Sequence, residues 1–319
     1  MEIIRKEKDF RRVFKNPVLT IGNFDGVHLG HQRIFHEVAE KAREISGESI
    51  VYTFEPHPVE LLAPQQKLLL ITSPQEKLRL IEEQGIDVVI CAPFSREFAK
   101  QTPEDFVKRI LYDQIKIRQL FVGHDYTFGK DRRGNIAMLM DLGRKLGFNV
   151  EVVEAFRVGG AVVSSTRIRE LIQKGAMAEA AKMLGRYYPL SGRVIHGHGR
   201  GSRKLGFPTA NLSSEGALFP KPGIYATWTY HEGKKYPGVA NLGWNPTFHD
   251  QKFSIEIHIL NFNRDIYGEP LRVEFVERLR DEITFRGPEE LIAQIKKDVS
   301  RAKMILRASS APLKRSEQG

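Results

Sequence analysis

The chain has 319 residues, of which 41% are hydrophobic and 28% charged, and its formal net charge is +10. This composition is typical of a soluble globular protein, and the length allows two domains with separate cores. No apolar run reaches the ~20 residues that cross a bilayer, and residues 1–12 lack the apolar centre of a signal peptide. The positive charge leaves nucleic acid, a membrane surface and phosphorylated small molecules as candidate partners.

The first predicted strand, 17–21, leads into a helical pattern at 34–45 through a glycine-rich turn, G-N-F-D-G-V-H-L-G-H. Such a turn brings free backbone N–H groups and the positive end of a helix dipole to one place. His28 and His31 can donate hydrogen bonds to nucleotide phosphates there, and Gly30 lets the backbone approach the ligand. The alternatives are two surface histidines or a zinc site, although no third metal ligand lies at suitable spacing.

Strand-like and helix-like segments alternate between residues 17 and 160. The predicted strands are 18–21, 49–54, 88–91, 119–122 and 149–153, and the predicted helices include 74–84 and 103–111. This alternation predicts a parallel sheet with helices on both faces, whose ligands bind beyond the carboxyl ends of the strands. The chain has no GxxxxGK[ST] motif and no GxGxxG that opens a helix, which excludes a P-loop and a dinucleotide-binding fingerprint. Cys91, the one cysteine, has no disulfide partner, so we expect a reducing cytoplasm.

Three later motifs carry site candidates, and the first two of them lie at the ends of predicted strands. In T-F-E-P-H-P the two prolines fix the direction of His57, in a site or simply in a rigid loop. In V-G-H-D-Y-T-F-G-K, Asp125 is the site candidate, whereas Tyr126 and Phe128 are expected in the core. In S-S-T-R-I-R, hydroxyl residues open a helix whose first turn carries arginines, where the dipole disfavours cations. An anion docking at that helix start would explain them.

After residue 186 the pattern changes to short alternating segments separated by turns. These segments are 191–196, 223–230, 236–240, 253–260 and 271–277. Strands without intervening helices predict an antiparallel sheet or small barrel. A helix from Pro288 closes the domain, with a stripe formed by Leu291, Ile292, Ile295, Val299 and Ala302. Residues 308–319 are expected to form a disordered tail.

The string G-H-G-R-G-S-R-K-L-G-F-P-T-A-N, residues 197–211, combines glycines with basic residues and suits a loop around phosphates. The hydroxyl of Thr209 and the amide oxygen of Asn211 are hard ligands suited to Mg²⁺ shared with ATP. Along 253–259 the apolar residues alternate, so Glu256 faces away from the aliphatic side. Its carboxylate is either an exposed group or a base that accepts a hydroxyl proton.

Over residues 14–306 these motifs, in order, resemble the bacterial bifunctional riboflavin kinase/FAD synthetases. The resemblance implies an adenylyltransferase domain at 1–186 and a riboflavin kinase domain at 187–307. It implies catalytic roles for Glu256, His28 and His31, and magnesium binding by Thr209 and Asn211. The residues implied to bind ATP or its phosphates are Gly22, Phe24, Asp25, Gly30, Ser164, Ser165, Thr166, Arg167, Arg169, Gly199, Lys204, Thr209 and Asn211. The residues implied to bind flavin are His57, Asp125, Asn245, Arg278 and Arg286.

The resemblance further implies that riboflavin, FMN and ATP are the partners, with no nucleic acid and no membrane. The C-terminal domain would convert riboflavin to FMN, and the N-terminal domain would convert FMN to FAD with release of pyrophosphate. Two alternatives stay open: an adenylyltransferase for another acceptor, such as a nicotinamide nucleotide, and a basic nucleic-acid-binding protein. The dispersed basic residues disfavour the second, and the P-T-A-N string disfavours the first. The oligomeric state is not indicated.

Overall fold

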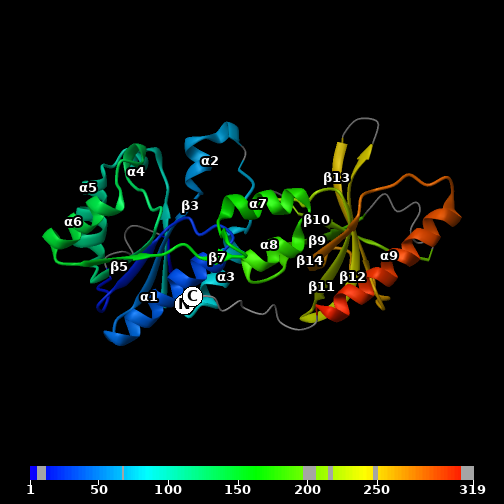
Figure 1. Ribbon diagram of the computed structural model, residues 1–319, viewed down its shortest axis with the longest axis horizontal. Helices are drawn as coiled ribbons and strands as arrows, with labels where there is room; N and C mark the ends of the chain where they lie inside the picture. The colour runs from blue at the N-terminus through cyan, green and yellow to red at the C-terminus, as the bar shows by residue number, and fades with distance from the viewer. Residues whose placement is uncertain (6–11, 67, 197–205, 215–217, 247–250, 310–319) are drawn as a thin grey trace. The chain divides into compact units, whose positions relative to one another are not determined.

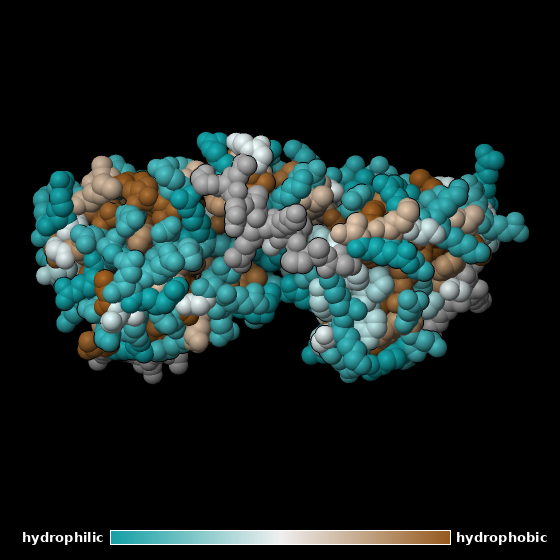
Figure 2. Space-filling model, turned by 60° about the horizontal axis from the view of Figure 1, so that its bottom comes forward, coloured by the Kyte–Doolittle hydropathy of each residue, from teal (hydrophilic) through white to brown (hydrophobic). Residues whose placement is uncertain are grey.

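The computed structural model describes residues 1–5, 12–66, 68–196, 206–214, 218–246 and 251–309. The chain divides into two compact units, Met1–Ser164 and Ser165–Gly319 (Figure 1). The predictions for Gly199, Lys204 and residues 310–319 lie outside the described residues. In the described part, no helix is both long and apolar enough to cross a membrane. Hydrophilic residues predominate on the face shown in Figure 2.

The first unit contains a six-stranded parallel sheet in the order β1-β4-β3-β2-β5-β6. The strands are β1 (Glu2–Ile4), β2 (Val18–Ile21), β3 (Ser49–Glu55), β4 (Val88–Pro93), β5 (Gln119–Gly123) and β6 (Asn149–Val153). From β2 the chain adds β3 and β4 on one side, and it later adds β5 and β6 on the other. The carboxyl end of β2 is therefore the topological switch point, where sheets of this kind bind ligands.

Helices cover both faces of this sheet, as predicted. On one face, α1 (Leu29–Glu44) and α3 (Pro74–Glu82) pack against Val18, Val51 and Val89. On the other, η3 (Phe106–Ile115) and α6 (Ile136–Leu146) pack against the opposite side of the same strands. The remaining elements of the unit are α2 (Pro58–Leu62), η2 (Pro64–Gln66), α4 (Arg96–Ala99), α5 (Pro103–Asp105), η4 (Lys130–Arg132), β7 (Arg157–Val158) and β8 (Ala161–Val162).

Two features of the first unit differ from the prediction. The charged N-terminal segment supplies β1, which pairs with β4 at the edge of the sheet. The helix predicted at 103–111 is a short α5 followed by the π-helix η3. Both hydrogen-bonding patterns leave the apolar residues of this segment on the core side, so the sequence pattern does not distinguish them.

The second unit begins with two helices, α7 (Ser165–Lys174) and α8 (Met177–Leu184), and continues as a closed antiparallel barrel in the order β10-β13-β12-β11-β14-β9. The strands are β9 (Tyr188–Ile195), β10 (Ala210–Ser213), β11 (Gly223–His231), β12 (Lys234–Pro246), β13 (Gln251–Ile259) and β14 (Pro270–Arg280). The predicted small barrel is confirmed, with β10 as a strand that the pattern did not reveal. Since α8 packs against β9 and β14, the compact unit starts before residue 187, and the predicted domain boundary there stays a prediction.

The closing helix is α9 (Pro288–Ala308), so Ala308 ends a helix and does not begin a tail. It packs on β11, β12 and β14. Ala302 and Leu306 are buried, whereas the predicted stripe residues before them are only partly buried. Asp298, which the pattern did not place in the interface, is 6% exposed and accepts hydrogen bonds from Arg280 at 2.7–3.0 Å. A buried ion pair therefore fastens the helix to the barrel.

Candidate active sites

His28 and His31 lie at the start of α1, directly beyond the carboxyl end of β2, as predicted. Their rings stack with centroids 3.5 Å apart. His28 caps α1, because its Nδ1 accepts a hydrogen bond from the backbone N–H of His31 at 3.3 Å. Since Nδ1 accepts, the proton of the neutral ring is on Nε2, which can donate to a phosphate oxygen. The pair thus adds side-chain donors to the positive end of a helix.

Two glycines of this turn make room for aromatic rings. A Cβ on Gly30 would lie 3.2 Å from Cε1 of His28, and a Cβ on Gly22 would lie 2.9 Å from Cζ of Phe24. Phe24 is 3% exposed, and its ring packs edge-on against His31 with centroids 5.2 Å apart. The side chain of Phe24 therefore supports His31, and the prediction that Phe24 binds ATP rests on its backbone.

Asp25 ties the same turn to the segment before α3. It is 4% exposed, and its carboxylate accepts hydrogen bonds from the backbone N–H groups of Ile71 at 3.0 Å and Thr72 at 3.1 Å. The Thr72 hydroxyl also donates to it at 3.2 Å. These contacts give Asp25 a structural role, and its predicted contact with ATP stays a prediction.

A pocket of about 370 Å³ opens beside this turn. Its wall consists of Asn23, Asp25, Phe54, Glu55, Pro56, His57, Glu60, Leu70, Thr72, Pro74 and Lys77. These residues come from the β2–α1 turn, the end of β3 and the segments around α2 and α3. His57, a predicted flavin-binding residue, is fixed there as the cap of α2, since its Nδ1 accepts a hydrogen bond from the Val59 N–H at 3.2 Å.

Lys77 lies in this pocket but belongs to none of the sequence motifs. Its Nζ donates hydrogen bonds to Oγ1 of Thr53 at 3.1 Å and to the carbonyl oxygen of Asn23 at 3.4 Å. Burial lowers the pKa of its ammonium group. No sequence signal marks Lys77, because a lysine within a predicted amphipathic helix usually belongs to the solvent face.

Asp125 lies in the turn after β5, the neighbour of β2 in the sheet. A Cβ on Gly123 would lie 3.5 Å from Oδ1 of Asp125 and 3.9 Å from Ile34 of α1, so the carboxylate and Ile34 both lie close to the end of β5. Asp125 therefore occupies the same edge of the sheet as His28. Phe128 is 7% exposed in the core and stacks on the partly buried Tyr126, as expected.

Ser165, Thr166, Arg167 and Arg169 begin α7, and Ser164 precedes it. The helix is anchored through Ile168 and Ile172, both fully buried, while Thr166 and Arg167 are exposed. These four residues belong to the second compact unit, whereas Ser164 and the histidine pair belong to the first. Their predicted contact with phosphates stays a prediction.

In the barrel, Asn211 of β10 lies directly opposite Glu256 of β13. Residues paired in this way point to the same face, with Cβ atoms about 4.5–5.5 Å apart. Ile255 and Ile257 are 3% and 0% exposed, whereas Glu256 is partly exposed, so its carboxylate faces the side opposite the aliphatic residues, as predicted. Thr209 lies just before β10. The fold therefore brings a predicted base close to the predicted metal ligands.

The segment before β10 is held against β13. The Nδ1–H of His258 donates to the carbonyl oxygen of Pro208 at 2.8 Å, and the ring of Phe207 packs edge-on against the same imidazole with centroids 5.5 Å apart. Since His258 lies two residues after Glu256, this contact fixes the position of Thr209 relative to Glu256.

A second pocket, of about 500 Å³, includes Thr209 in its wall. Its other lining residues are Val194, Pro208, Ala210, Ile257, Ile259, Phe262, Asn263, Arg264, Asp265, Ile266 and Tyr267. Tyr267 stacks on His196 with ring centroids 3.9 Å apart. The stretch from Asn263 lies between the predicted strands 253–260 and 271–277, where the sequence pattern indicates a turn. Its mixture of basic, acidic and aromatic residues was the available signal for a site.

The side chain of Asn245 lies outside the described part of the structure, and neither Arg278 nor Arg286 is in the wall of the two pockets described above. Asn245 lies near the end of β12, in register with Lys252 of β13. The guanidinium of Arg278 donates to the Pro222 carbonyl oxygen at 2.5 Å. The backbone N–H of Arg286 donates to Glu290 at 2.9 Å. Flavin contacts by Asn245, Arg278 and Arg286 stay predictions.

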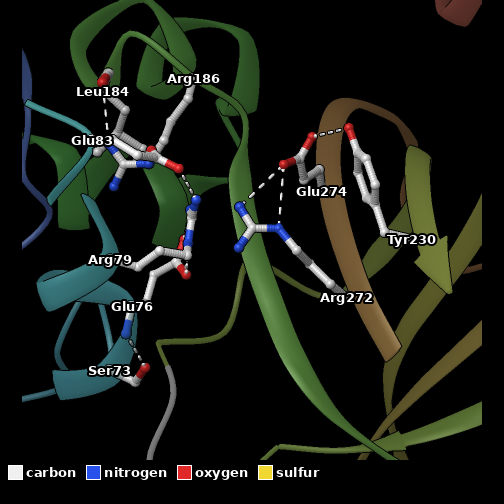
Figure 3. Close-up of polar contacts among 9 residues, drawn as sticks. All are labelled: Ser73, Glu76, Arg79, Glu83, Leu184, Arg186, Tyr230, Arg272 and Glu274. Atoms are coloured by element: carbon white, nitrogen blue, oxygen red, sulfur yellow. Dashed lines mark hydrogen bonds and ion pairs between the residues drawn. The ribbon is translucent and has the colours of Figure 1, made fainter. Parts of the chain in front are cut away.

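Several other polar groups have local partners. In Figure 3, Glu274 accepts hydrogen bonds from Tyr230 at 3.0 Å and from Arg272 at 3.2 Å, and Arg79 pairs with Glu76 at 2.8 Å. Burial, with a smaller effect of Glu274, raises the pKa of Tyr230 to about 12. These contacts connect neighbouring turns and strands, so we assign them a structural role.

One cluster of the described residues has the composition of a metal site. His231, Glu232 and Glu269 offer ligand atoms within 4.8 Å of one another. However, Nε2 of His231 contacts Glu269, and Arg264 pairs with Glu232 at 2.8 Å. Because His231 and Arg264 already contact the two carboxylates, the cluster fastens the β11–β12 turn to the loop before β14.

The folds and sites define a two-domain protein. Its sheet is of the nucleotidylyltransferase type and carries the HxGH turn, His28–His31. Its barrel carries the P-T-A-N segment, in which Asn211 lies opposite Glu256. The family model for FAD synthetase matches residues 11–167, and the model for riboflavin kinase matches residues 184–306. A curated relative from Haemophilus influenzae, described as bifunctional riboflavin kinase/FMN adenylyltransferase, is 38% identical over 304 residues, which cover 95% of this chain and 98% of the relative.

The Escherichia coli K12 relative with the same description is 38% identical over 282 residues, covering 88% of this chain and 90% of the relative. A solved structure described as a macrolide-efflux protein from Streptococcus pneumoniae superimposes with a TM-score of 0.87 at 31% identity, covering 95% of this chain and 99% of that one. The chain belongs to the bifunctional riboflavin kinase/FMN adenylyltransferase family.

Proposed function

We propose that this chain makes FMN from riboflavin and ATP in its barrel domain, and FAD from FMN and a second ATP in its sheet domain. The observation that carries the proposal is the Asn211–Glu256 pairing, because it assembles a kinase-type site from two motifs far apart in the sequence. The stacked His28–His31 pair at the switch point supports the second activity.

In the kinase step, Glu256 accepts the proton of the terminal ribityl hydroxyl of riboflavin as its oxygen attacks the γ-phosphorus of ATP. The γ-phosphoryl group moves to that oxygen, and ADP leaves. The oxygen donors of Thr209 and Asn211, next to a carboxylate, fit Mg²⁺, which prefers oxygen ligands. When bound, Mg²⁺ would neutralise charge on the phosphates.

In the adenylylation step, a phosphate oxygen of FMN attacks the α-phosphorus of ATP, and pyrophosphate leaves. No protein nucleophile is required. Nε2–H of His28, the imidazole of His31 and the N–H groups at the start of α1 stabilise the charge that develops on the phosphates. We also assign binding of a phosphate group to Ser164, Ser165, Thr166, Arg167 and Arg169, because hydroxyl and guanidinium groups at a helix start suit an anion.

The test is to mix the purified chain with riboflavin, ATP and Mg²⁺ and to separate the flavins by chromatography over time. FMN should form first and FAD should follow. His31→Ala should block FAD formation, so that FMN accumulates. Glu256→Gln should block FMN formation but leave FAD formation from added FMN. A wild-type chain that forms neither flavin product refutes the proposal, and a product formed with a nicotinamide nucleotide instead would support another acceptor.

A further inference from the structure

Lys77 is a cation in the sheet-domain pocket whose described partners are both neutral. Its ammonium group donates to the Thr53 hydroxyl and the Asn23 carbonyl oxygen, the second at a long 3.4 Å. No described carboxylate forms an ion pair with it. An ammonium has three N–H donors, so these two contacts leave capacity for a further acceptor.

The acidic groups around Lys77 are engaged elsewhere or solvated. Asp25 accepts hydrogen bonds from the Ile71–Thr72 segment, Glu55 pairs with Arg5 at 3.6 Å, and Glu60 is exposed. Burial is the largest influence on the pKa of Lys77 and lowers it, while the charges of Cys91, Asp25, Glu55 and Glu60 act in the opposite direction. A partly buried cation without a paired anion is costly, and an anion that enters the pocket would offset that cost.

The position of Lys77 indicates which anion this is. It contacts Asn23, and the next residue, Phe24, packs its ring against His31. Lys77 also contacts the end of β3, the strand beside β2 in the sheet. A ligand group bound by Lys77 would therefore lie beside the histidine pair, at the edge where the nucleotide binds.

We propose that Lys77 binds a phosphate group of a substrate in the sheet-domain pocket. This proposal rests on the proposed adenylyltransferase function. Ammonium and phosphate form a charge-assisted hydrogen bond, and the pocket of about 370 Å³ that Lys77 and His57 both line has room for a phosphate group. Two substrates carry that group, since FMN brings a monophosphate and ATP a triphosphate.

The experiment compares Lys77→Met, which removes the charge, with Lys77→Arg, which retains it. Lys145→Met is the matched control, because Lys145 is an exposed lysine of α6 whose Nζ pairs with Asp141 at 2.6 Å. FAD formation from added FMN is measured as a function of FMN and of ATP. The reverse reaction, in which pyrophosphate attacks FAD to give FMN and ATP, is measured as a function of pyrophosphate. Circular dichroism reports on the folding of each variant, and riboflavin phosphorylation checks that the barrel domain is unaffected.

If Lys77 holds the FMN phosphate, Lys77→Met raises the KM for FMN by about 10-fold to 100-fold and leaves the KM for pyrophosphate unchanged. If it holds the triphosphate, the KM values for ATP and pyrophosphate rise together. In both cases Lys77→Arg recovers much of the loss. The proposal is overturned if Lys77→Met matches Lys145→Met in every one of these constants, or if Lys77→Arg is as impaired as Lys77→Met. A wild-type chain that makes no FAD refutes the proposed function instead.

Discussion

Asn211 and Glu256 face each other across two neighbouring antiparallel strands, so an amide oxygen and a carboxylate share one side of the barrel wall. Neither strand alone carries a site. β10 has four residues, and β13 has alternating aliphatic residues like any half-buried strand. The register between the two strands brings the two side chains together, and the hydrogen bond from His258 to the Pro208 carbonyl oxygen holds the segment that carries Thr209 beside them.

The first prediction concerns the base. Glu256→Gln keeps the size of the side chain, but its amide cannot accept the proton that we propose Glu256 takes from the ribityl hydroxyl. Riboflavin phosphorylation should fall by about 10²–10⁴-fold, the usual contribution of general base catalysis. FAD formation from added FMN should be unchanged. The control is Glu277→Gln, a partly exposed glutamate of β14, which should retain both activities when assayed by chromatography.

The second prediction concerns the space around His28. Gly30→Ala places a methyl group 3.2 Å from Cε1 and 3.3 Å from Nδ1 of the imidazole, closer than ordinary contact. The ring must shift, and its cap on the His31 N–H weakens. We expect FAD formation to fall by about 10-fold or more, since displaced donors no longer match the transition state. Riboflavin phosphorylation by the same molecule serves as the control, and equal loss of both activities would contradict the prediction.

The third prediction concerns stability and pH. Lys77→Met removes a partly buried ammonium, and Thr53 retains its own hydrogen bond to Asn23 at 3.3 Å. The variant should therefore be more stable than wild type at neutral pH, by about 0.5–2 kcal/mol, although it is less active. Urea unfolding followed by circular dichroism measures this difference.

The sign of the pH effect follows from the lowered pKa of Lys77. Between that pKa and the ordinary value of 10.5, the unfolded chain binds more protons than the folded chain. Wild-type stability attributable to this group therefore rises with pH in that window, and the advantage of Lys77→Met shrinks. An advantage that stays constant up to pH values near 10.5 would show that Lys77 does not titrate as proposed.

The fourth prediction concerns the closing helix. Asp298→Ala leaves the guanidinium of Arg280 without its main partner at a largely buried position, with 19% of its side chain exposed. We expect a loss of about 3–5 kcal/mol in the unfolding free energy of the barrel domain. Glu277→Ala breaks the more exposed pair with Arg301 and should cost at most about 1 kcal/mol. Equal effects of the two changes would contradict the assigned role of Asp298.

The parallel sheet was predictable because its strands are continuous apolar runs, and the observed bounds of β2 and β6 coincide with the prediction. The barrel was predictable as a class because its strands follow one another without helices. The histidine pair and the P-T-A-N segment were predictable because each combines unusual residue types at a position that the fold leaves open to ligands. The positions of Asp125 and Glu256 relative to these segments depended on the strand order and register, which only the structure supplies.

Other residues and elements could not be predicted from the local sequence pattern. Lys77, Asp298 and the pocket residue Arg264 carry charges that are ordinary on a solvent-exposed face, and only tertiary packing makes them partly buried or places them in a pocket wall. The short strand β10 follows a glycine-rich loop, and its pairing with β9 and β13 defines it more than its own sequence does. The contacts of Phe24 and Asp25 were also not predictable from the sequence, because they depend on tertiary packing. Both side chains support the turn that carries His28 and His31.

The edge strand β1 has a practical consequence for handling the protein. Its three residues pair with Val88, Val89 and Ile90 of β4, so they occupy hydrogen-bonding groups that would otherwise be open to another chain. Shortening the N-terminus past Ile4 would expose an apolar strand to intermolecular pairing. Purification tags are therefore better placed at the other terminus, and aggregation of shortened chains would be an expected result of losing these few residues.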